Sequence, residues 1–424
     1  MKALSGNGSD RRQSHVLIIE PSSSGTQLIA AVSRLGHRAL VLSHNDADRT
    51  VPPAELARWG AELVVVDTND LAAVLACASR LAEQRDIVGV LPGFEYYVPT
   101  AALLAAEFGL PGLAPEICLR VRDKLQMRQA LAAAGIAGPV FRPVAGRDEL
   151  AAVAGQVGFP LVLKPTQSAG SIHVTLVHSL AELRAAYDAI VTDATLDFGV
   201  SLGPEALVEE FVAGPEFSVE GYVRNGRTVV VSITEKLVSE PPGFIELGHT
   251  VPAALDAGCR CVIRDWTAEV VRALGVDCTV FHLELRLRDG VPYVIEFGAR
   301  LAGDAIPLLI ELSTGVDLAD IFVRLATDRP IEDITALPTD SARQVAAIRF
   351  FYEPGLEVIS SAPAPAELHA LPAVISGEVT AGPGDRPNCW LDSRSRLGWV
   401  MMTGADRPSV DRSWNAVRRT VRFT

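Results

Sequence analysis

The first 92 residues alternate four short, continuous apolar runs with segments of helical periodicity. The runs are too short for buried helices and lack the polar alternation of a strand with one wet face, so they are typical of strands buried on both faces of a parallel sheet. The pattern predicts a Rossmann-like α/β layer with helices on both sides of the sheet. The runs are residues 15–20 ("HVLIIE"), 39–43 ("ALVLS"), 63–67 ("LVVVD") and 87–92 ("IVGVLP").

The length of the chain predicts more than one domain, because 424 residues exceed what a single hydrophobic core usually organises. We expect a flexible tail at 1–14 and the Rossmann-like domain at 15–112. An α+β body rich in β-type segments follows at 113–330. Residues 331–424, which contain many Pro, Gly and Ala residues, are expected to form a smaller β-rich unit.

The composition excludes several classes of protein. Apolar residues make up 49% and charged residues 21% of the chain, as in ordinary globular proteins. The net charge of −13 is spread along the sequence, so we expect no nucleic-acid partner and no membrane partner. The start lacks the apolar segment of a signal peptide and no CxxC spacing occurs, which favours a cytoplasmic protein with reduced core thiols. The cysteines are Cys77, Cys118, Cys259, Cys261, Cys278 and Cys389.

An acid-bearing hairpin is predicted around the sequence "LELRLRDGVPYVIEF". If residues 288–290 form a three-residue loop, Leu287 faces Val291 and one face of the hairpin is wholly apolar. In that register Glu284 and Glu296 become diagonal neighbours on the other face, roughly 7–8 Å apart. Two carboxylates held so close favour a cation between them, and oxygen ligands are what Mg²⁺ prefers.

Two alternatives to this metal site stay open. The acids could lie on the surface, where Arg286 and Arg300 would balance their charge. A two-residue loop would place Glu284 and Glu296 on opposite faces of the hairpin, which would remove the argument for a shared metal ion.

A possible phosphate site begins at Lys164, which ends the apolar strand "GFPLVLKP". A loop follows at 166–171, "TQSAGS", and the backbone N–H groups of such a loop can hold phosphate while the lysine supplies positive charge. A solvated lysine at the end of a strand is the alternative.

An adenine site is the corresponding hypothesis for "LVEEFVAGPEFSVEG" (207–221), where acids flank a Gly-Pro turn. Backbone groups of Glu210 and Val212 could bond the base, and Glu216 could reach the ribose. The alternative is an ordinary strand-turn-strand edge.

The first turn of the chain, "EPSSSGTQ" (20–27), lacks the GxGxxG motif. This absence opposes a dinucleotide dehydrogenase and favours a plain capped helix.

Taken in order, four motifs between residues 15 and 350 resemble those of the ATP-grasp superfamily. "DKLQMRQALAAAGIAGP" resembles its first lysine helix, and "VLKPTQSAGS" its second lysine strand and phosphate loop. "VEEFVAGPEFSVEG" is similar to its adenine hinge, and "FHLELRL…VIEFGARLAGD" to its metal-binding hairpin. The resemblance makes 113–330 an ATP-grasp domain, with a nucleotide-binding lid at about 140–212.

The resemblance also implies roles for individual residues. Glu284 and Glu296 would bind Mg²⁺, or Mn²⁺ in its place. Arg300 would stabilise the transferred phosphoryl group, and Lys164 would be catalytic as well as nucleotide-binding. ATP would be held by Lys124, Lys164, Ser168, Gly170, Ser171, Glu209, Glu210, Phe211, Val212 and Glu216.

Within the superfamily, "GHTVPA" and "GARLAGDAIPLLIELSTGVDL" most resemble the L-amino acid and dipeptide ligases of secondary metabolism. This branch implies an ADP-forming carboxylate-amine ligase that works through an acyl phosphate on small-molecule substrates. Residues 238–253 are our candidate specificity loop, because specificity pockets in such a fold come from loops. A homodimer is implied by the same resemblance. The substrate residues would be His249, Arg300, Gly303 and Asp304.

Two departures from the family pattern qualify this interpretation. Gly298 stands where many members have an Asn metal ligand, and His173 stands where the phosphate loop often has glycine. These departures leave a nucleotide-binding module without chemistry as the alternative from another class. A carboxylase or a purine-type ligase, which would use a small acid in place of an amino acid, is the alternative enzyme.

Overall fold

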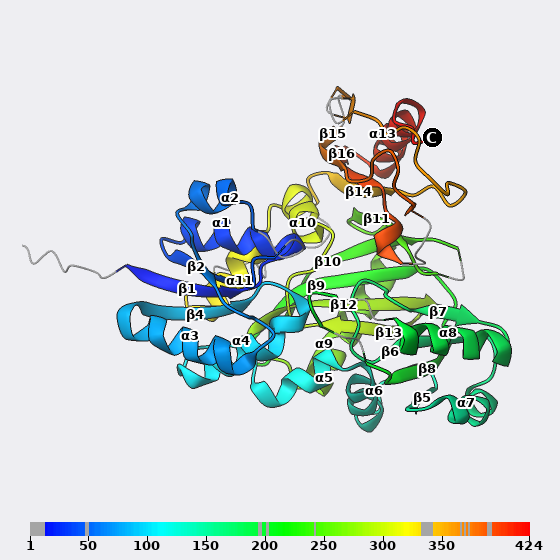
Figure 1. Cartoon of the computed structure of the whole chain (residues 1–424), viewed down its shortest axis with the longest axis horizontal. Helices are drawn as coiled ribbons and strands as arrows, with labels where there is room; N and C mark the ends of the chain where they lie inside the picture. The colour runs from blue at the N-terminus through cyan, green and yellow to red at the C-terminus, as the bar shows by residue number, and fades with distance from the viewer. Residues whose placement is uncertain are drawn as a thin grey trace, which may run out of the picture.

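A computed structural model describes residues 13–46, 51–193, 197–200, 203–240, 243–331, 342–364, 367–368, 370–371, 374–387 and 392–424. Within these ranges the chain forms a four-stranded parallel sheet, an eight-stranded antiparallel sheet and a four-stranded antiparallel sheet (Figure 1). The expected fold class, a Rossmann-like layer followed by ATP-grasp-type α+β sheets and C-terminal strands, is confirmed.

The N-terminal sheet has the strand order β3-β2-β1-β4. Val16 and Ile18 of β1 pack into one core, while Leu17 and Ile19 pack into another on the opposite face, which explains the unbroken apolar run. The strands are β1 (Ser14–Ile19), β2 (Arg38–Ser43), β3 (Glu62–Val65) and β4 (Asp86–Pro92). The helices of this part are α1 (Gln27–Arg34), α2 (Pro53–Trp59), α3 (Leu71–Gln84) and α4 (Val98–Glu107).

A distant helix completes this layer. Helix α11 (Leu318–Ala326) packs against α1 and β4, and its Ile321 and Phe322 share a core with Val16 and Ile18. Helices α3 and α4 supply the cover of the other face. The N-terminal sheet is therefore closed by a segment that follows the acidic hairpin in sequence, and this ties the two regions together.

The small antiparallel sheet has the order β5-β8-β6-β7 and is backed by two helices, α7 and α8 (Figure 1). Its core is formed by aliphatic side chains such as Leu163, Leu183 and Val208. Two short helices, α5 (Cys118–Arg122) and α6 (Lys124–Ala133), lead into it. Its elements are β5 (Phe141–Val144), α7 (Leu150–Val157), β6 (Leu161–Pro165), β7 (Thr175–Val177), α8 (Leu180–Thr192) and β8 (Ala206–Glu210).

The large sheet has the order β13-β12-β9-β10-β11-β14-β16-β15. The C-terminal strands extend this sheet, because β14 pairs with β11, while α13 packs on their own small core. Its strands are β9 (Glu216–Arg224), β10 (Arg227–Val238), β11 (Glu246–Val251), β12 (Thr279–Arg288), β13 (Val291–Gly298), β14 (Val345–Phe351), β15 (Val374–Val379) and β16 (Gly398–Gly404). The remaining helices are α9 (Ala257–Leu274), α10 (Ile306–Thr314) and α13 (Arg407–Thr420).

The expected three-residue loop of the acidic hairpin is wrong. Arg288 pairs with Val291, so the loop consists of Asp289 and Gly290 alone. Both loop residues have positive φ, 53° and 78°, as a primed two-residue turn requires. Asp-Gly is among the sequences best suited to that geometry, and the shorter loop shifts the whole predicted register by one residue.

A β-bulge nevertheless returns the two acids to one face. Leu285 pairs with Val294, but the next pair is Glu284 with Glu296, which leaves Ile295 as the extra residue on β13. The carboxylates thus lie directly opposite each other and not on a diagonal. The bulge cancels the effect of the short loop, so the shared acidic face survives although its predicted register does not.

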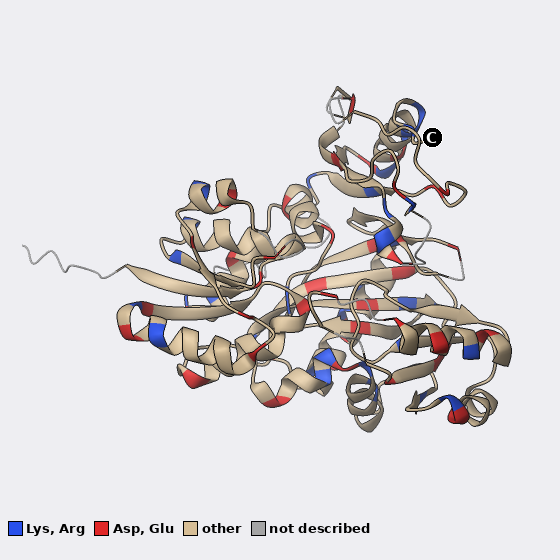
Figure 2. Ribbon diagram, viewed as in Figure 1, with Lys and Arg blue, Asp and Glu red and all other residues tan. Residues whose placement is uncertain are grey.

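Charged residues of both signs are interspersed along the ribbon in Figure 2, in agreement with a net charge that forms no block. In the part of the chain that the structure describes, no helix combines the length and the apolarity needed to cross a membrane. Cys77 and Cys118 are buried and Cys261 is exposed. Cys389 and residues 1–12 of the predicted tail lie outside the described residues.

The turn geometry predicts opposite effects for two glycine substitutions. Gly290→Ala should lower the free energy of unfolding by about 1 kcal/mol, because alanine is strained at φ 78°. Gly155→Ala is the matched control: the residue is exposed within α7, its added Cβ would meet nothing within 4 Å, and alanine should raise stability by roughly 0.5–1 kcal/mol. Urea denaturation measures both, and equal signs would contradict the turn assignment.

Candidate active site

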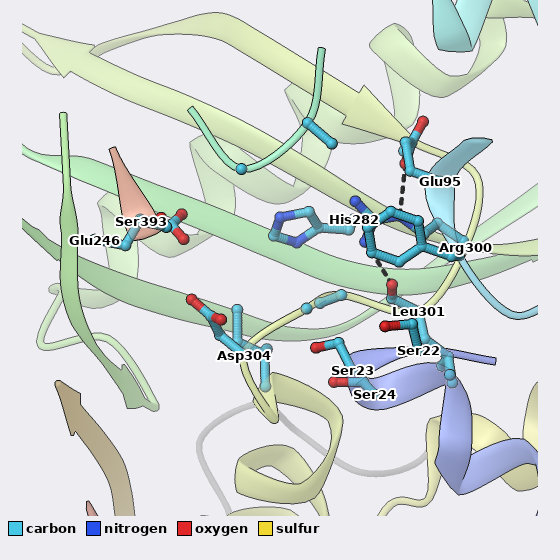
Figure 3. A pocket seen from close by; sticks show the side chains of 18 of the residues that line it. Ser22, Ser23, Ser24, Glu95, Glu246, His282, Arg300, Leu301, Asp304 and Ser393 are labelled. Atoms are coloured by element: carbon cyan, nitrogen blue, oxygen red, sulfur yellow. Dashed lines mark hydrogen bonds and ion pairs between the residues drawn. The ribbon is translucent and has the colours of Figure 1, made fainter. Parts of the chain in front are cut away.

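Two adjoining cavities lie against the large sheet. The hinge cavity runs from Lys164 and Phe211 on one side to Ile295 and Glu296 on the other. The inner cavity lies between the N-terminal layer and the large sheet (Figure 3). Their common lining consists of Ser171, Glu284 and Glu296. The acidic pair of the hairpin therefore stands where the two cavities meet.

A buried charge cluster forms the base of the hinge cavity. Lys164 Nζ lies 2.6 Å from Glu209 Oε2, and Arg128 Nε lies 2.6 Å from Glu209 Oε1. Burial lowers the pKa of Lys164 to about 8 against the opposing effect of Glu209. Burial would raise the pKa of Glu209, but Arg128 and Lys164 hold it at about 2. The carboxylate of Glu209 thus forms ion pairs with both Arg128 and Lys164, and it positions the Lys164 side chain.

The bulge contributes to the same cluster, because Arg128 also donates from Nη2 to the carbonyl oxygen of Ile295 at 3.1 Å. The Ile295 side chain lines the hinge cavity beside Glu296. One arginine thereby links the small sheet to the bulged hairpin strand of the large sheet. Sequence reasoning missed Arg128, since nothing in its helix distinguishes it from a surface arginine.

Lys124 joins the phosphate-type loop to the hairpin. It follows Asp123, whose side chain caps α6 by accepting from the N–H of Gln126, and it is buried. Its Nζ donates to the carbonyl oxygen of Ser168 at 2.8 Å and lies 3.1 Å from Glu296 Oε1. Both predicted lysines are therefore brought to the hinge cavity.

The loop after Lys164 lies between the two cavities. Ser168 lines the hinge cavity, Gly170 lines the inner cavity, and Ser171 lines both. His173, where glycine is common in the family, adopts a φ of 57°, and its Nε2 lies 2.7 Å from Asp193 Oδ2. His173 thus adopts a left-handed backbone conformation, and its side chain contacts the residue that ends α8.

Arg286 organises the hinge. Its Nε lies 2.9 Å from Glu216 Oε2, and its Nη1 donates to the carbonyl oxygen of Val212 at 3.1 Å. The guanidinium lies 5.4 Å from the ring centre of Phe211 and 5.1 Å from that of Phe244, which comes from the predicted specificity loop. Three of the predicted hinge residues therefore meet around Arg286, for which the sequence suggests only the role of a surface counter-ion.

Glu210 lines the hinge cavity. Its Oε1 is 2.5 Å from Arg288 Nη1, and its Oε2 accepts from the N–H of Val140 at 3.2 Å. Both carboxylate oxygens of Glu210 therefore have partners within the protein.

A buried lysine from β10 connects the cavities. Lys236 Nζ lies 3.0 Å from Glu216, 2.7 Å from Glu246 and 2.8 Å from Glu284. Burial disfavours its charge, but the three carboxylates raise the pKa of Lys236 well above its usual range. His282 adds a second contact to Glu284 at 3.0 Å, so this acid has two partners.

The alternative in which Arg286 and Arg300 balance the acidic pair is wrong. Glu284 contacts Lys236 and His282, Glu296 contacts Lys124, and the two arginines engage other carboxylates. Two opposed carboxylates are an oxygen donor set that suits Mg²⁺. Glu284 and Glu296 thus fit the metal that the resemblance implied.

Arg300 lines the inner cavity and is held from the N-terminal layer (Figure 3). Its Nε lies 2.5 Å from Oε2 of Glu95, which is buried, and its Nη1 donates to the carbonyl oxygen of Leu301 at 2.6 Å. A Cβ added to Gly298 would lie 3.1 Å from the same Glu95 oxygen. The glycine that departs from the family pattern therefore leaves room for the Glu95–Arg300 pair.

A further cluster closes the inner cavity. Glu246, His249 and Asp304 offer ligand atoms within 4.8 Å of one another. Glu246 is paired with Lys236, whereas Asp304 accepts from Arg396 Nη1 at 2.6 Å and Nη2 at 3.1 Å. Both acids of this cluster therefore have a cationic partner.

All four predicted substrate residues line the inner cavity: His249, Arg300, Gly303 and Asp304. His249 Nε2 lies 3.1 Å from Asp304 Oδ2. Arg396 was missed because it lies 92 positions from Asp304 in a weakly patterned part of the chain. Only the folding of the C-terminal strands onto the large sheet brings it there.

The serine run of the first turn also faces the inner cavity (Figure 3). Ser22 precedes the first helical turn but makes no side-chain capping hydrogen bond, so the expected capped helix is wrong in that detail. Ser24 Oγ is buried and has no hydrogen-bond partner among the described residues. The run therefore contributes polar groups to the cavity wall.

Comparisons with known proteins agree with this geometry. Residues 157–308 match the ATP-grasp domain family, and residues 345–424 match the L-amino acid ligase C-terminal domain 2 family. The chain is 32% identical over 317 residues to dapdiamide A synthase of Enterobacter agglomerans, which covers 71% of this chain and 70% of the relative. This chain belongs to the L-amino acid ligase branch of the ATP-grasp superfamily. It is thereby a member of a family of ATP-dependent, ADP-forming amino acid ligases.

Other relatives of the ligase extend the similarity over nearly its whole length. The uncharacterized protein y4rH of Sinorhizobium fredii is 30% identical over 401 residues, which covers 94% of the ligase and 80% of that protein. The crystal structure of an L-amino acid ligase from Bacillus licheniformis shares the fold, with a TM-score of 0.81 and 22% identity over 98% of this chain and 99% of that one.

The low pKa of Lys164 predicts that the ligase binds nucleotide more weakly above pH 8. A neutral amine cannot attract phosphate, so the affinity for a non-hydrolysable ATP analogue should fall by up to about tenfold per pH unit as the pH rises above about 8. Isothermal titration calorimetry between pH 7 and 9.5 measures this.

Lys164→Arg provides the control for that titration, because a guanidinium stays charged throughout the range. Its binding should show no such fall. A flat profile for the unsubstituted ligase, or the same slope in Lys164→Arg, would contradict the assignment.

Proposed function

We propose that this ligase joins the carboxylate of one amino acid to the amine of another, with formation of an acyl phosphate and release of ADP and phosphate. One observation carries the proposal: the hinge cavity and the inner cavity meet at Glu284, Glu296 and Ser171. A nucleotide in the hinge cavity would thus present its terminal phosphate to a substrate in the inner cavity.

The hinge cavity has the features that a nucleotide requires. Backbone groups of Glu210 and Val212 are our candidates for the base, and the Phe211 and Phe244 rings supply apolar surface beside Arg286. The phosphates would lie toward Lys124, Lys164 and the 166–171 loop. The two lysines come from different elements, so they can neutralise charge from two sides.

Glu284 and Glu296 would hold Mg²⁺, whose chemistry is to neutralise the phosphate oxygens during transfer. Lys124, Lys236 and His282 contact these acids. Burial would lower the pKa of His282, but Glu220 and Glu284 raise it to about 9, so the imidazole is cationic at neutral pH.

Phosphoryl transfer needs positioning and charge neutralisation more than a protein nucleophile. Arg300, oriented by Glu95 and by the carbonyl oxygen of Leu301, would bind the developing negative charge on the transferred group. The incoming amine would then attack the acyl carbon, with phosphate as the leaving group. The loop at 166–171 is our candidate for excluding water from this intermediate.

The charges of the inner cavity support amino acids as substrates. Glu246 provides negative charge and Arg300 provides positive charge in the same space. An amino acid carries an ammonium and a carboxylate, so a cavity with both signs can recognise each end. The C-terminal match to L-amino acid ligases supports ligation of amino acids over carboxylation. A role in secondary metabolism remains our prediction. A cytoplasmic homodimer stays our prediction.

Product analysis tests the proposed reaction. Purified protein with ATP and Mg²⁺ should release ADP and phosphate only when two amino acids are present, and mass spectrometry should find their summed mass minus one water. Release of AMP and pyrophosphate would overturn the acyl-phosphate route. A carboxylated product would identify the alternative ligase class.

Glu296→Gln should reduce ADP release by about 100-fold or more, because the neutral amide is a poor ligand for Mg²⁺. Glu62→Gln is a matched control, since the side chains of Glu62 and Glu296 are 33% and 32% exposed and each lies near a basic residue. Full activity in Glu296→Gln, or equal loss in the control, would remove the metal assignment.

A further inference from the structure

A third space, the outer groove, lies directly behind the inner cavity. It runs between α10, the serine turn of the N-terminal layer and the C-terminal strands, and it is bounded by apolar side chains such as Leu308, Ile348, Phe350 and Trp399. Its volume of about 730 Å³ exceeds the 250 Å³ of the inner cavity. The chain therefore holds more room next to the proposed reaction site than the inner cavity itself offers.

The inner cavity and the outer groove share part of their wall. The residues that line both are Ser23, Ser24, Ser393, Asp304 and Arg396. The serine side chains are too short to span a cavity. The Asp304–Arg396 ion pair is therefore the part of the wall that can block a substrate.

This ion pair is built as a fixed element. Arg396 makes two hydrogen bonds to Asp304, at 2.6 and 3.1 Å, and its guanidinium carbon lies 3.9 Å from the ring centre of Phe350 on the groove side. His249 holds Asp304 from the inner side at 3.1 Å. A bidentate pair stacked on an aromatic ring has little freedom to rotate away.

We propose that the Asp304–Arg396 pair is a partition that limits the length of the substrate side chain. It would select amino acids with short side chains for the position that faces it, and its removal would let longer side chains extend into the outer groove. This inference rests on the proposed function. Arg396 comes from the part of the chain that matches the C-terminal ligase domain, so that domain would set substrate size.

The test uses Asp304→Ala together with Arg396→Ala, because removal of one partner alone leaves a partly buried charge unpaired. Catalytic efficiency, kcat/KM, is measured for product formation with short side chains (Ala, Ser) and long ones (Phe, Arg) at each substrate position. The ratio of long to short should rise at least about tenfold in the double variant. Fragmentation mass spectra identify the position that changes.

A matched control removes an equivalent ion pair elsewhere. Arg407 of α13 makes two hydrogen bonds of 2.8 Å to Glu235 of β10, and neither residue lines the inner cavity or the outer groove. Glu235→Ala with Arg407→Ala also loosens the C-terminal strands and helix, but it should leave the long-to-short ratio unchanged. An equal rise in this control would overturn the partition.

Two further outcomes would also overturn it. These are an unchanged ratio in a folded, active double variant, and loss of product with every amino acid while the variant still binds an ATP analogue. If the alanine variant does not fold, Asp304→Asn with Arg396→Gln keeps polar groups and shortens the barrier, and the ratio should rise in the same direction. Failure of the unsubstituted protein to join any pair would reject the proposed function, whereas a product with an unmoved ratio would reject only this inference.

Discussion

The site depends on the contacts between the buried ammonium group of Lys236 and the carboxylates around it. Three carboxylates from three different strands converge on it, those of Glu216, Glu246 and Glu284. Burying any of these carboxylates without a cation would cost folding free energy, and so would burying the lysine without the carboxylates. Because Glu216 and Glu284 line the hinge cavity while Glu246 and Glu284 line the inner cavity, one cation fixes the relative position of the two.

Residues from distant parts of the chain position the side chains that line the inner cavity. Glu95 orients Arg300 from the N-terminal layer, and Arg396 holds Asp304 from the C-terminal strands. Helix α11 binds the N-terminal sheet to the region after the hairpin. The site is therefore assembled at the meeting point of all parts of the fold, and its charges are balanced across those boundaries.

In the acidic hairpin, the predicted and the observed structure place both acids on one face but reach that arrangement through different backbone geometries. The sequence places Glu284 and Glu296 on one face only through a three-residue loop, whereas the chain uses Asp289 and Gly290 alone and adds a bulge at Ile295. Both routes restore the same face, because each adds one residue to the path between the acids. A bulge inside an apolar run leaves no composition signal, so it could not have been predicted.

The sequence by itself determined the order of strands and helices, the two lysines, the hinge and the acidic hairpin, because apolar periodicity and short motifs depend on neighbouring residues. Tertiary structure alone decided which cations balance the acids, why Gly298 is small and which residue closes the inner cavity. Those contacts join Arg300 to Glu95, 205 positions apart, and Arg396 to Asp304, 92 apart. No local pattern encodes such pairs, since they exist only once the sheets have packed together.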